Sequence, residues 1–454
     1  MSTAARAFRR YDARLVGWLS VGQLITWGSV FYTFALLMEP VERELGLSRA
    51  QSSLAFSLAL LAEGLLAYPV GRWIDRGHER AVMTGGSLLV AALLALHSQI
   101  SSLAGFYAVW AGLGAALAAT LYNPAFAVVT RRFPDDFRRA IITLTFLGGL
   151  ASTVFIPLSA ALVAQLGWRY TLWVLAALHL LVCAPLHAWV LRGAPRHALP
   201  GTASVASTAA STASPPASPP AAFPATLPAT AAERPHGSPT SANAPPAPSE
   251  PAASLRHWLR NPAFVRLGIF VVVMMAVAAA LPAHLVSLLR ENRLAEAWVV
   301  AIPASIGVIQ VAGRALLYFF EQRFDVHRAN RLIPCLIPLG LAALLVAGWA
   351  AGWSSAVQTT AALLFVLLYG LGNGMLTIVK GTAMAQYVSR AHVASLNGAL
   401  GLPMALARAV APWLLGVLWS PARGYTLGIA SLLAVSLLAV AALWAAQKHA
   451  LGRA

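Results

Sequence analysis

The chain has 454 residues, of which 59% are hydrophobic and only 10% are charged. This composition excludes an ordinary soluble domain and is typical of membrane proteins. The formal net charge of +17 does not indicate nucleic-acid binding, because the cations cluster at the ends of apolar segments and form no single basic face. Cys183 and Cys335 both lie inside apolar segments. No metal or other cofactor is therefore expected.

A helix that crosses a bilayer needs about 20 mainly apolar residues. The sequence predicts twelve such spans, six in each half of the chain. The first six cover about 15–38, 50–70, 81–98, 103–129, 138–164 and 169–191. The second six cover about 262–289, 297–320, 330–350, 355–386, 393–419 and 424–446.

The loop Gly71–Arg80, which reads GRWIDRGHER, sets the orientation of these spans. It is a short cationic loop between two apolar segments, and such loops lie on the cytoplasmic side. With this loop inside, only six of the 32 Lys and Arg residues fall in external loops: Arg43, Arg49, Arg169, Arg290, Arg293 and Arg423. The expected protein is therefore a multi-pass protein of the cell (inner) membrane, with both termini cytoplasmic.

Between the two sets of spans lies a segment of different composition. Pro200–Ala253 consists mostly of Ala, Pro, Ser and Thr, which cannot bury enough apolar area to fold, so it is expected to be disordered. The predicted organisation is an N-terminal six-helix bundle (1–192), a cytoplasmic linker (193–255) and a C-terminal six-helix bundle (256–454). The linker is either a tether or a docking segment. Transporters built from two such repeats bind substrate near the membrane midplane.

The loop also carries a family resemblance. GRWIDRGHER resembles the loop between spans two and three of the major facilitator superfamily. Four residues match that pattern, namely Gly71, Asp75, Arg76 and Arg80, whereas His78 replaces a glycine and Glu79 replaces a basic residue. The resemblance implies a twelve-helix, two-bundle transporter, usually a monomer, in which these four residues tie the inner gate.

Further segments resemble monocarboxylate-transporter-like members of that superfamily. They are WGSVFYTFALLMEPVERELGLSRAQSSLAFSLAL (residues 27–60), Pro157 and Gly167–Arg169. Arg314 matches an arginine that those transporters carry in span eight. Gln310 stands where they have an aspartate, and Tyr32 stands where they have a lysine. The resemblance supports the fold and a transport function more than it supports any one substrate.

Charges inside the membrane are costly, so each one is a functional candidate. The predicted spans contain Glu63, Arg314, Lys380 and Arg408, and their sum of charges favours an anionic substrate. Arg314 shares a helical face with Gln310, and its guanidinium group can bind a carboxylate through two hydrogen bonds. The alternative for Arg314 is an ion pair at the inner gate.

The remaining candidates are weaker. Lys380 shares a face with Asn373 and Thr377, as in a cavity wall, although it could instead extend toward the cytoplasm. Glu63 could carry a proton, because burial favours the protonated carboxyl group, or could form a static ion pair. Arg408 is expected to be structural. Tyr32 and Asn123 are further candidates for the cavity wall.

The leading functional prediction is a secondary transporter that moves a small organic anion, such as a monocarboxylate, by alternating access with proton coupling. The expected interactions are with that substrate, protons and the lipid bilayer. Efflux of drugs or hydrophobic compounds is the alternative transport function. A non-transporting sensor that signals through the linker is the alternative from another class. No enzyme is expected, because we identify no nucleophile–base pair or phosphate-binding loop.

Overall fold

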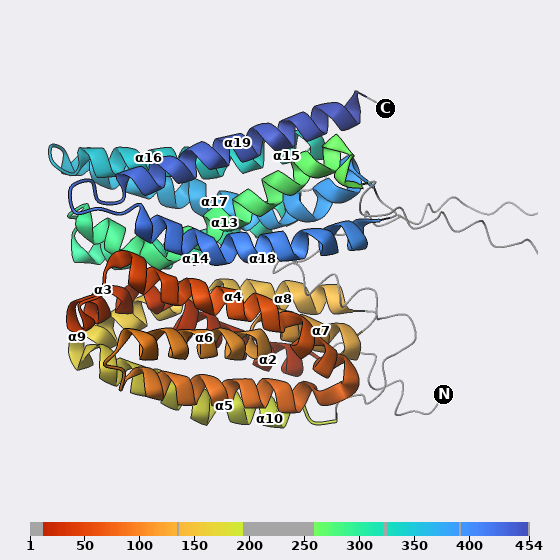
Figure 1. The fold of residues 1–454 in the computed structure, drawn as a ribbon. Coiled ribbons are helices and arrows are strands. Elements are labelled where there is room, and N and C mark those ends of the chain that lie inside the picture. Colours follow the sequence, from red (N-terminus) through yellow and green to blue (C-terminus); the bar gives the residue numbers. More distant parts are fainter. Residues whose placement is uncertain (1–11, 134–135, 194–257, 321–324, 390–391, 453–454) are drawn as a thin grey trace, which may run out of the picture.

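The computed structural model describes residues 12–133, 136–193, 258–320, 325–389 and 392–452. These residues form an all-α protein, as predicted. Figure 1 shows two helical bundles side by side, one from each half of the chain. Apart from Gly193, the predicted linker lies outside the described residues.

The N-terminal bundle contains the following helices: α2 (Ala13–Thr26), η1 (Trp27–Tyr32), α3 (Phe34–Leu45), α4 (Arg49–Trp73), η2 (Ile74–His78), α5 (Glu79–His97), α6 (Leu103–Thr120), α7 (Tyr122–Arg132), α8 (Phe137–Gly149), α9 (Ala151–Leu178), η3 (His179–Cys183) and α10 (Ala184–Val190). Here η1, η2 and η3 are π-helical turns. The chain enters α4 through a capping box, in which the Ser48 side chain accepts from the Gln51 amide and the Gln51 side chain accepts from the Ser48 amide.

The C-terminal bundle contains α13 (Pro262–Glu291), α14 (Glu296–Phe320), α15 (Val326–Leu332), η5 (Ile333–Cys335), α16 (Leu336–Ala350), α17 (Ser355–Tyr387), α18 (Val393–Val417) and α19 (Thr426–Leu451). Its core is a cluster of buried apolar side chains that includes Phe270, Leu341 and Phe365. Many large apolar side chains on the outside of both bundles, such as Leu181 and Trp349, are exposed, as expected for surfaces that face lipid.

Ten helical stretches in the described residues are long and apolar enough to cross a membrane. Two of them, Arg49–His97 (49 residues) and Arg139–Val190 (52 residues), each cover two of the predicted spans. Each contains a glycine with positive φ, Gly77 (89°) or Gly167 (74°), a conformation that residues with a Cβ rarely adopt. The ten stretches are therefore consistent with the twelve predicted spans.

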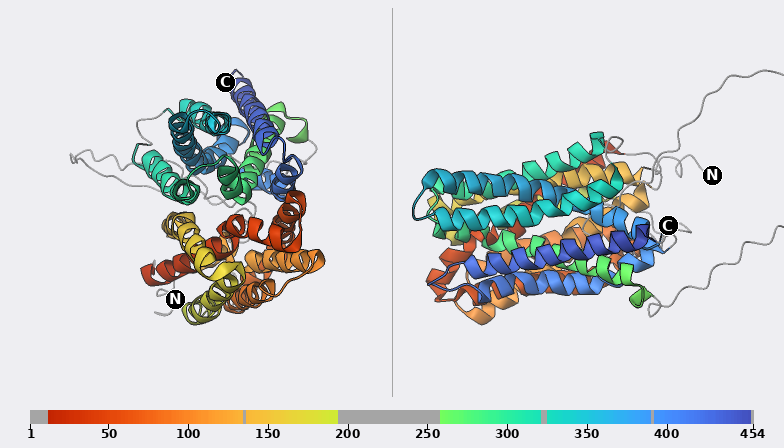
Figure 2. Two further views of the ribbon diagram at one scale, coloured as in Figure 1. Left: turned by 90° about the vertical axis from the view of Figure 1, so that its left-hand side faces the viewer. Right: turned by 90° about the horizontal axis from the view of Figure 1, so that it is seen from above.

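The bundles meet mainly where α4 packs on α18, α9 on α14 and α3 on α13. The end-on view in Figure 2 shows the two groups of helices facing each other across this interface. The two ends of the molecule are called the loop face and the clasp face. The loop face carries the turn at Gly77, and the clasp face carries Arg49 at the opposite end of α4.

Candidate functional site

Two adjoining cavities lie between the bundles. The loop-side cavity, of about 570 Å³, reaches the loop face, since Gly71, Arg72 and Asp75 form part of its wall. The central chamber, of about 160 Å³, lies nearer the clasp face. Met275 and Arg408 line both cavities, so the two spaces are neighbours. Helices of both bundles contribute to each wall, as expected for a substrate path at a repeat interface.

The central chamber brings together five of the predicted site residues: Tyr32, Gln310, Arg314, Asn373 and Thr377. Arg314 Nη1 donates to the carbonyl oxygen of Thr145 (3.1 Å), and its Nε donates to that of Gly374 (3.4 Å). Gly374 permits close approach of α17 to α14, because a Cβ there would lie 2.3 Å from the Gln310 carbonyl oxygen. Among the described residues, no carboxylate forms an ion pair with Arg314.

An aromatic wall covers the N-terminal side of the chamber. It consists of Trp27, Phe31, Tyr32 and Tyr122, all of which line the cavity. The Trp27 ring lies 4.9 Å from Phe31 and 5.2 Å from Tyr122, measured between centroids. Trp27 and Tyr32 are the two ends of the π-helical turn η1, in which residues five apart occupy successive turns. The π-turn therefore places both rings on the chamber side of span one.

Lys380 lies in the loop-side cavity, separate from Arg314. The two cations therefore line adjoining cavities and do not share one. The Lys380 side chain is only 5% exposed, and its Nζ has no hydrogen-bond partner within the described part of the chain. Asn123 lines the same cavity. A buried cation without a counterion is costly, so this cavity favours an anion.

Glu63 and Arg408 form an ion pair across the bundle interface. Arg408 Nη2 lies 3.6 Å from Glu63 Oε2, and the glutamate is 6% exposed. Arg408 was expected to be structural, and this pairing gives it a partner on the opposite bundle. Glu63 therefore neutralises Arg408. Lys380 and Arg314 remain without a carboxylate partner in the residues described.

The sequence did not reveal how the turn at the loop face is anchored. Gly71 and Asp75 line the loop-side cavity, whereas Arg76 and Arg80 are exposed. Glu79 is fully buried and accepts from Arg132 Nε of α7 at 2.6 Å. In the sequence, Glu79 stood out only as a mismatch to the family pattern.

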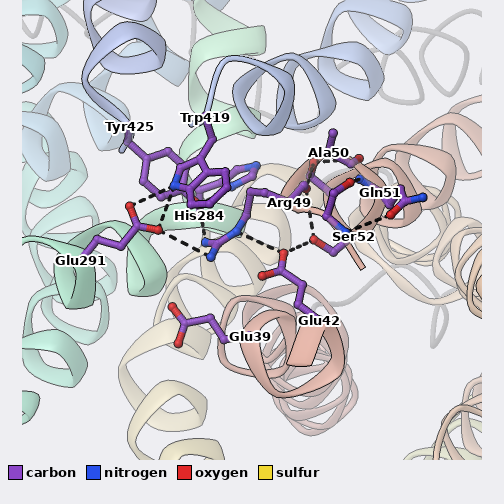
Figure 3. A network of polar contacts seen from close by, with 12 residues as sticks. Glu39, Glu42, Arg49, Ala50, Gln51, Ser52, His284, Glu291, Trp419 and Tyr425 are labelled. Carbon is purple, nitrogen blue, oxygen red and sulfur yellow. Dashed lines mark hydrogen bonds and ion pairs between the residues drawn. The ribbon is translucent and has the colours of Figure 1, made fainter. Parts of the chain in front are cut away.

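A polar cluster at the clasp face was also missed. Figure 3 shows Arg49 at its centre, between residues of both bundles. Arg49 Nε lies 3.1 Å from Glu42 of its own bundle, and Arg49 Nη2 lies 3.5 Å from Glu291 of the other bundle. Arg49 Nη1 donates to the Tyr425 hydroxyl (2.7 Å), and the guanidinium group lies 5.1 Å from the Trp419 ring centroid. We call these five residues the clasp.

Two further contacts reinforce the clasp. His284 lies between the Pro412 carbonyl oxygen and the Tyr425 hydroxyl, each at 2.9 Å, and so fixes the position of that hydroxyl. Arg290 of α13 forms an ion pair with Glu39 of α3. Ionic contacts thus join the bundles at the clasp face, while the larger cavity lies toward the loop face. The molecule is therefore held closed at the clasp face.

Comparisons with known proteins agree with this architecture. The family model described as Major Facilitator Superfamily matches residues 19–412. The fold is similar to a bacterial homologue of the human lysosomal transporter Spinster in an inward-facing, unoccupied conformation (TM-score 0.65, 16% identity, covering 97% of this chain and 98% of that one). It is also similar to a nucleoside transporter (TM-score 0.68, 14% identity, covering 95% of this chain and 98% of that one). A human organic anion transporter is similar as well (TM-score 0.56, 17% identity, covering 96% of this chain and 100% of that one). No curated protein sequence matches the chain.

Proposed function

The chain belongs to the Major Facilitator Superfamily, and from this premise we propose that it carries a small organic anion with proton coupling. As a member of that family it is a multi-pass membrane transporter and not an enzyme. Its driving force is therefore an ion gradient or the gradient of the substrate itself. We further propose that the loop face is cytoplasmic, as the positive-inside rule predicts, and that the two bundles rock about the cavities.

The observation that carries the proposal is the unpaired Arg314 in the central chamber. Among the described residues its guanidinium group donates only to two carbonyl oxygens, and none of those that line this chamber is Asp or Glu. A substrate carboxylate would supply the missing negative charge through the remaining N–H groups. Lys380 would attract the anion from the loop-side cavity. A cationic drug would instead require acidic groups here.

A monocarboxylate is the finer proposal. It is supported by Arg314, the one cation of the central chamber that has no ion-pair partner within the described part of the chain, and by the resemblance of residues 27–60 and Arg314 to monocarboxylate-transporter-like proteins. Gln310 and Tyr32 depart from that pattern, so their contacts with substrate would differ from those in that group.

The direct test is a thermal-shift screen of the purified protein against carboxylates, amines and uncharged drugs. A ligand that binds only the folded state raises its stability by mass action. We expect carboxylates to raise the unfolding temperature and amines of the same size to leave it unchanged. Stabilisation by amines or drugs alone would replace this proposal with the efflux function.

Proton coupling assigns a separate role to Glu63. Glu63→Gln keeps the shape of the side chain but removes the group that binds a proton. We expect this variant to lose proton-driven accumulation of substrate and to retain exchange of internal for external substrate, because exchange needs no net proton movement. Both are measured in proteoliposomes.

The matched control is Glu44→Gln, since Glu44 pairs with Arg169 at the clasp face and lines neither cavity. This control should accumulate substrate as the wild type does. Normal accumulation by Glu63→Gln would remove Glu63 as the coupling site. Loss of both accumulation and exchange would assign the Glu63–Arg408 pair a structural role.

A further inference from the structure

We infer that the transported anion is an aromatic monocarboxylate, whose carboxylate binds Arg314 and whose ring packs on Trp27, Tyr32 and Tyr122. This inference rests on the proposed function, since it requires that the central chamber be an anion site. It adds that the group attached to the carboxylate is aromatic.

The shape of the chamber wall supports a ring. The i→i+5 hydrogen bond from the Thr33 amide to the Gly28 carbonyl oxygen (3.1 Å) marks the π-turn that places Trp27 and Tyr32 on one face. Their centroids are 6.5 Å apart, and Tyr122 adds a third ring 5.2 Å from Trp27. π-Helical turns occur frequently at functional sites. Such a wall offers stacked and edge-to-face contacts to a planar ring.

The polar groups around the chamber include several hydrogen-bond donors. Tyr369 is 2% exposed and lines the chamber, yet its hydroxyl has no hydrogen-bond partner among the residues that the structure describes. Trp27 also lines the chamber, and its Nε1 likewise has no hydrogen-bond partner among the described residues. Together with Arg314, these groups call for oxygen acceptors on the ligand. A carboxylate provides them, and a buried donor without an acceptor would otherwise be costly.

The charge of the chamber limits the ligand to a monoanion. Of the residues that the structure describes, the two cations that line it are Arg314 and Arg408, and Arg408 is already paired with Glu63. Lys380 belongs to the loop-side cavity. One unpaired cation beside an apolar and aromatic wall matches one carboxylate on an aromatic body.

The test compares four probes by equilibrium binding to the full-length protein: phenylacetate, cyclohexylacetate and phenethylamine, which are of similar size, and acetate, which lacks the ring. Cyclohexylacetate is the decisive control, because its ring is at least as hydrophobic but lacks a π face. We expect phenylacetate to bind about threefold to tenfold more tightly than cyclohexylacetate, in line with aromatic pair energies, and acetate to bind weakest. Phenethylamine should not bind.

The outcomes separate the inference from the proposed function. Equal or tighter binding of cyclohexylacetate would overturn the aromatic inference and leave an anion carrier. If none of the three carboxylates binds, whether or not phenethylamine binds, both the aromatic inference and the proposed function are overturned.

Tyr369→Phe supplies a second test. Removing a hydroxyl that has no partner in the described structure should leave the ligand-free protein as stable as the wild type or more stable, while weakening phenylacetate binding about tenfold. The control is Tyr387→Phe, because the Tyr387 hydroxyl accepts from Asn330 and Gln447 and lines neither cavity. That variant should lose thermal stability and keep its affinity. Unchanged phenylacetate binding by Tyr369→Phe would show that the hydroxyl does not contact the ligand.

Discussion

Arg314→Lys is expected to bind a carboxylate probe at least tenfold more weakly than the wild type. Lysine keeps the positive charge but loses the planar fork that holds a carboxylate through two parallel hydrogen bonds. One hydrogen bond to a charged group contributes about 1.5–3 kcal/mol, which corresponds to about 10-fold to 150-fold in affinity. Equilibrium binding to protein in nanodiscs measures the loss, with the unfolding temperature as a check on folding.

Lys380→Ala is the comparison for that experiment. Because Lys380 lines the loop-side cavity, its removal should weaken binding in the central chamber less than Arg314→Lys does. If Arg314→Lys and Lys380→Ala both bind the probe as tightly as the wild type, the cations are not substrate ligands. The reverse order of effects would move the principal site to the loop-side cavity.

Arg49→Ala is expected to open the clasp face. Arg49 joins Glu42 of one bundle to Glu291 and Tyr425 of the other, so its loss leaves two carboxylates near each other without their shared cation. Removing one partner of a buried ion pair costs about 3–5 kcal/mol. The contacts with Glu291 and Tyr425 cross between the bundles, so the part of the cost that they carry falls on the clasped state, and the population should shift toward the state that is open at this face.

Hydrogen–deuterium exchange measures that shift at both faces. Exchange should rise in residues 46–57 at the clasp face and fall in residues 398–406 beside the loop-side cavity, because closing one face accompanies opening the other. Arg169→Ala is the matched control, since Arg169 pairs with Glu44 within the same bundle. Equal exchange changes in the two variants, or faster exchange at both faces, would contradict a role of Arg49 as a gate.

The fold could be predicted from the sequence because each element carries its own signal. A spanning helix must be apolar along its length, and the loop between two spans must be polar, so both can be identified without knowledge of their neighbours. The positive φ of Gly77 likewise agrees with a turn in GRWIDRGHER. The all-α, two-bundle fold was confirmed, and the Major Facilitator Superfamily match agrees with it.

The site was only partly predictable, because its contacts cross between helices. Helical spacing grouped Arg314 with Gln310, and Lys380 with Asn373, but could not show that a second cavity separates Lys380 from Arg314. The π-turn at Trp27–Tyr32 departs from the regular spacing that such grouping assumes. Which pairs of residues meet depends on how the two bundles are docked.

The clasp shows the same limit. Arg49 counted only as one of six cations in external loops. Its partner Glu291 lies 242 positions further along the chain, at the end of a span in the other half. The available signal in the sequence was a set of carboxylates at the ends of spans in opposite halves, namely Glu39, Glu42 and Glu291. It identifies partners of Arg49 only once the fold has brought those span ends together.

Transport of an organic anion is tested most directly in proteoliposomes that contain the purified full-length protein. An imposed pH gradient, acidic outside, drives uptake of labelled phenylpyruvate or of labelled phenethylamine, with empty liposomes and the Arg314→Ala variant as controls. We predict saturable accumulation of phenylpyruvate by the wild type alone and no protein-dependent accumulation of phenethylamine. Protein-dependent movement of the amine, with none of the carboxylate, would contradict the assignment of this chain as an anion carrier.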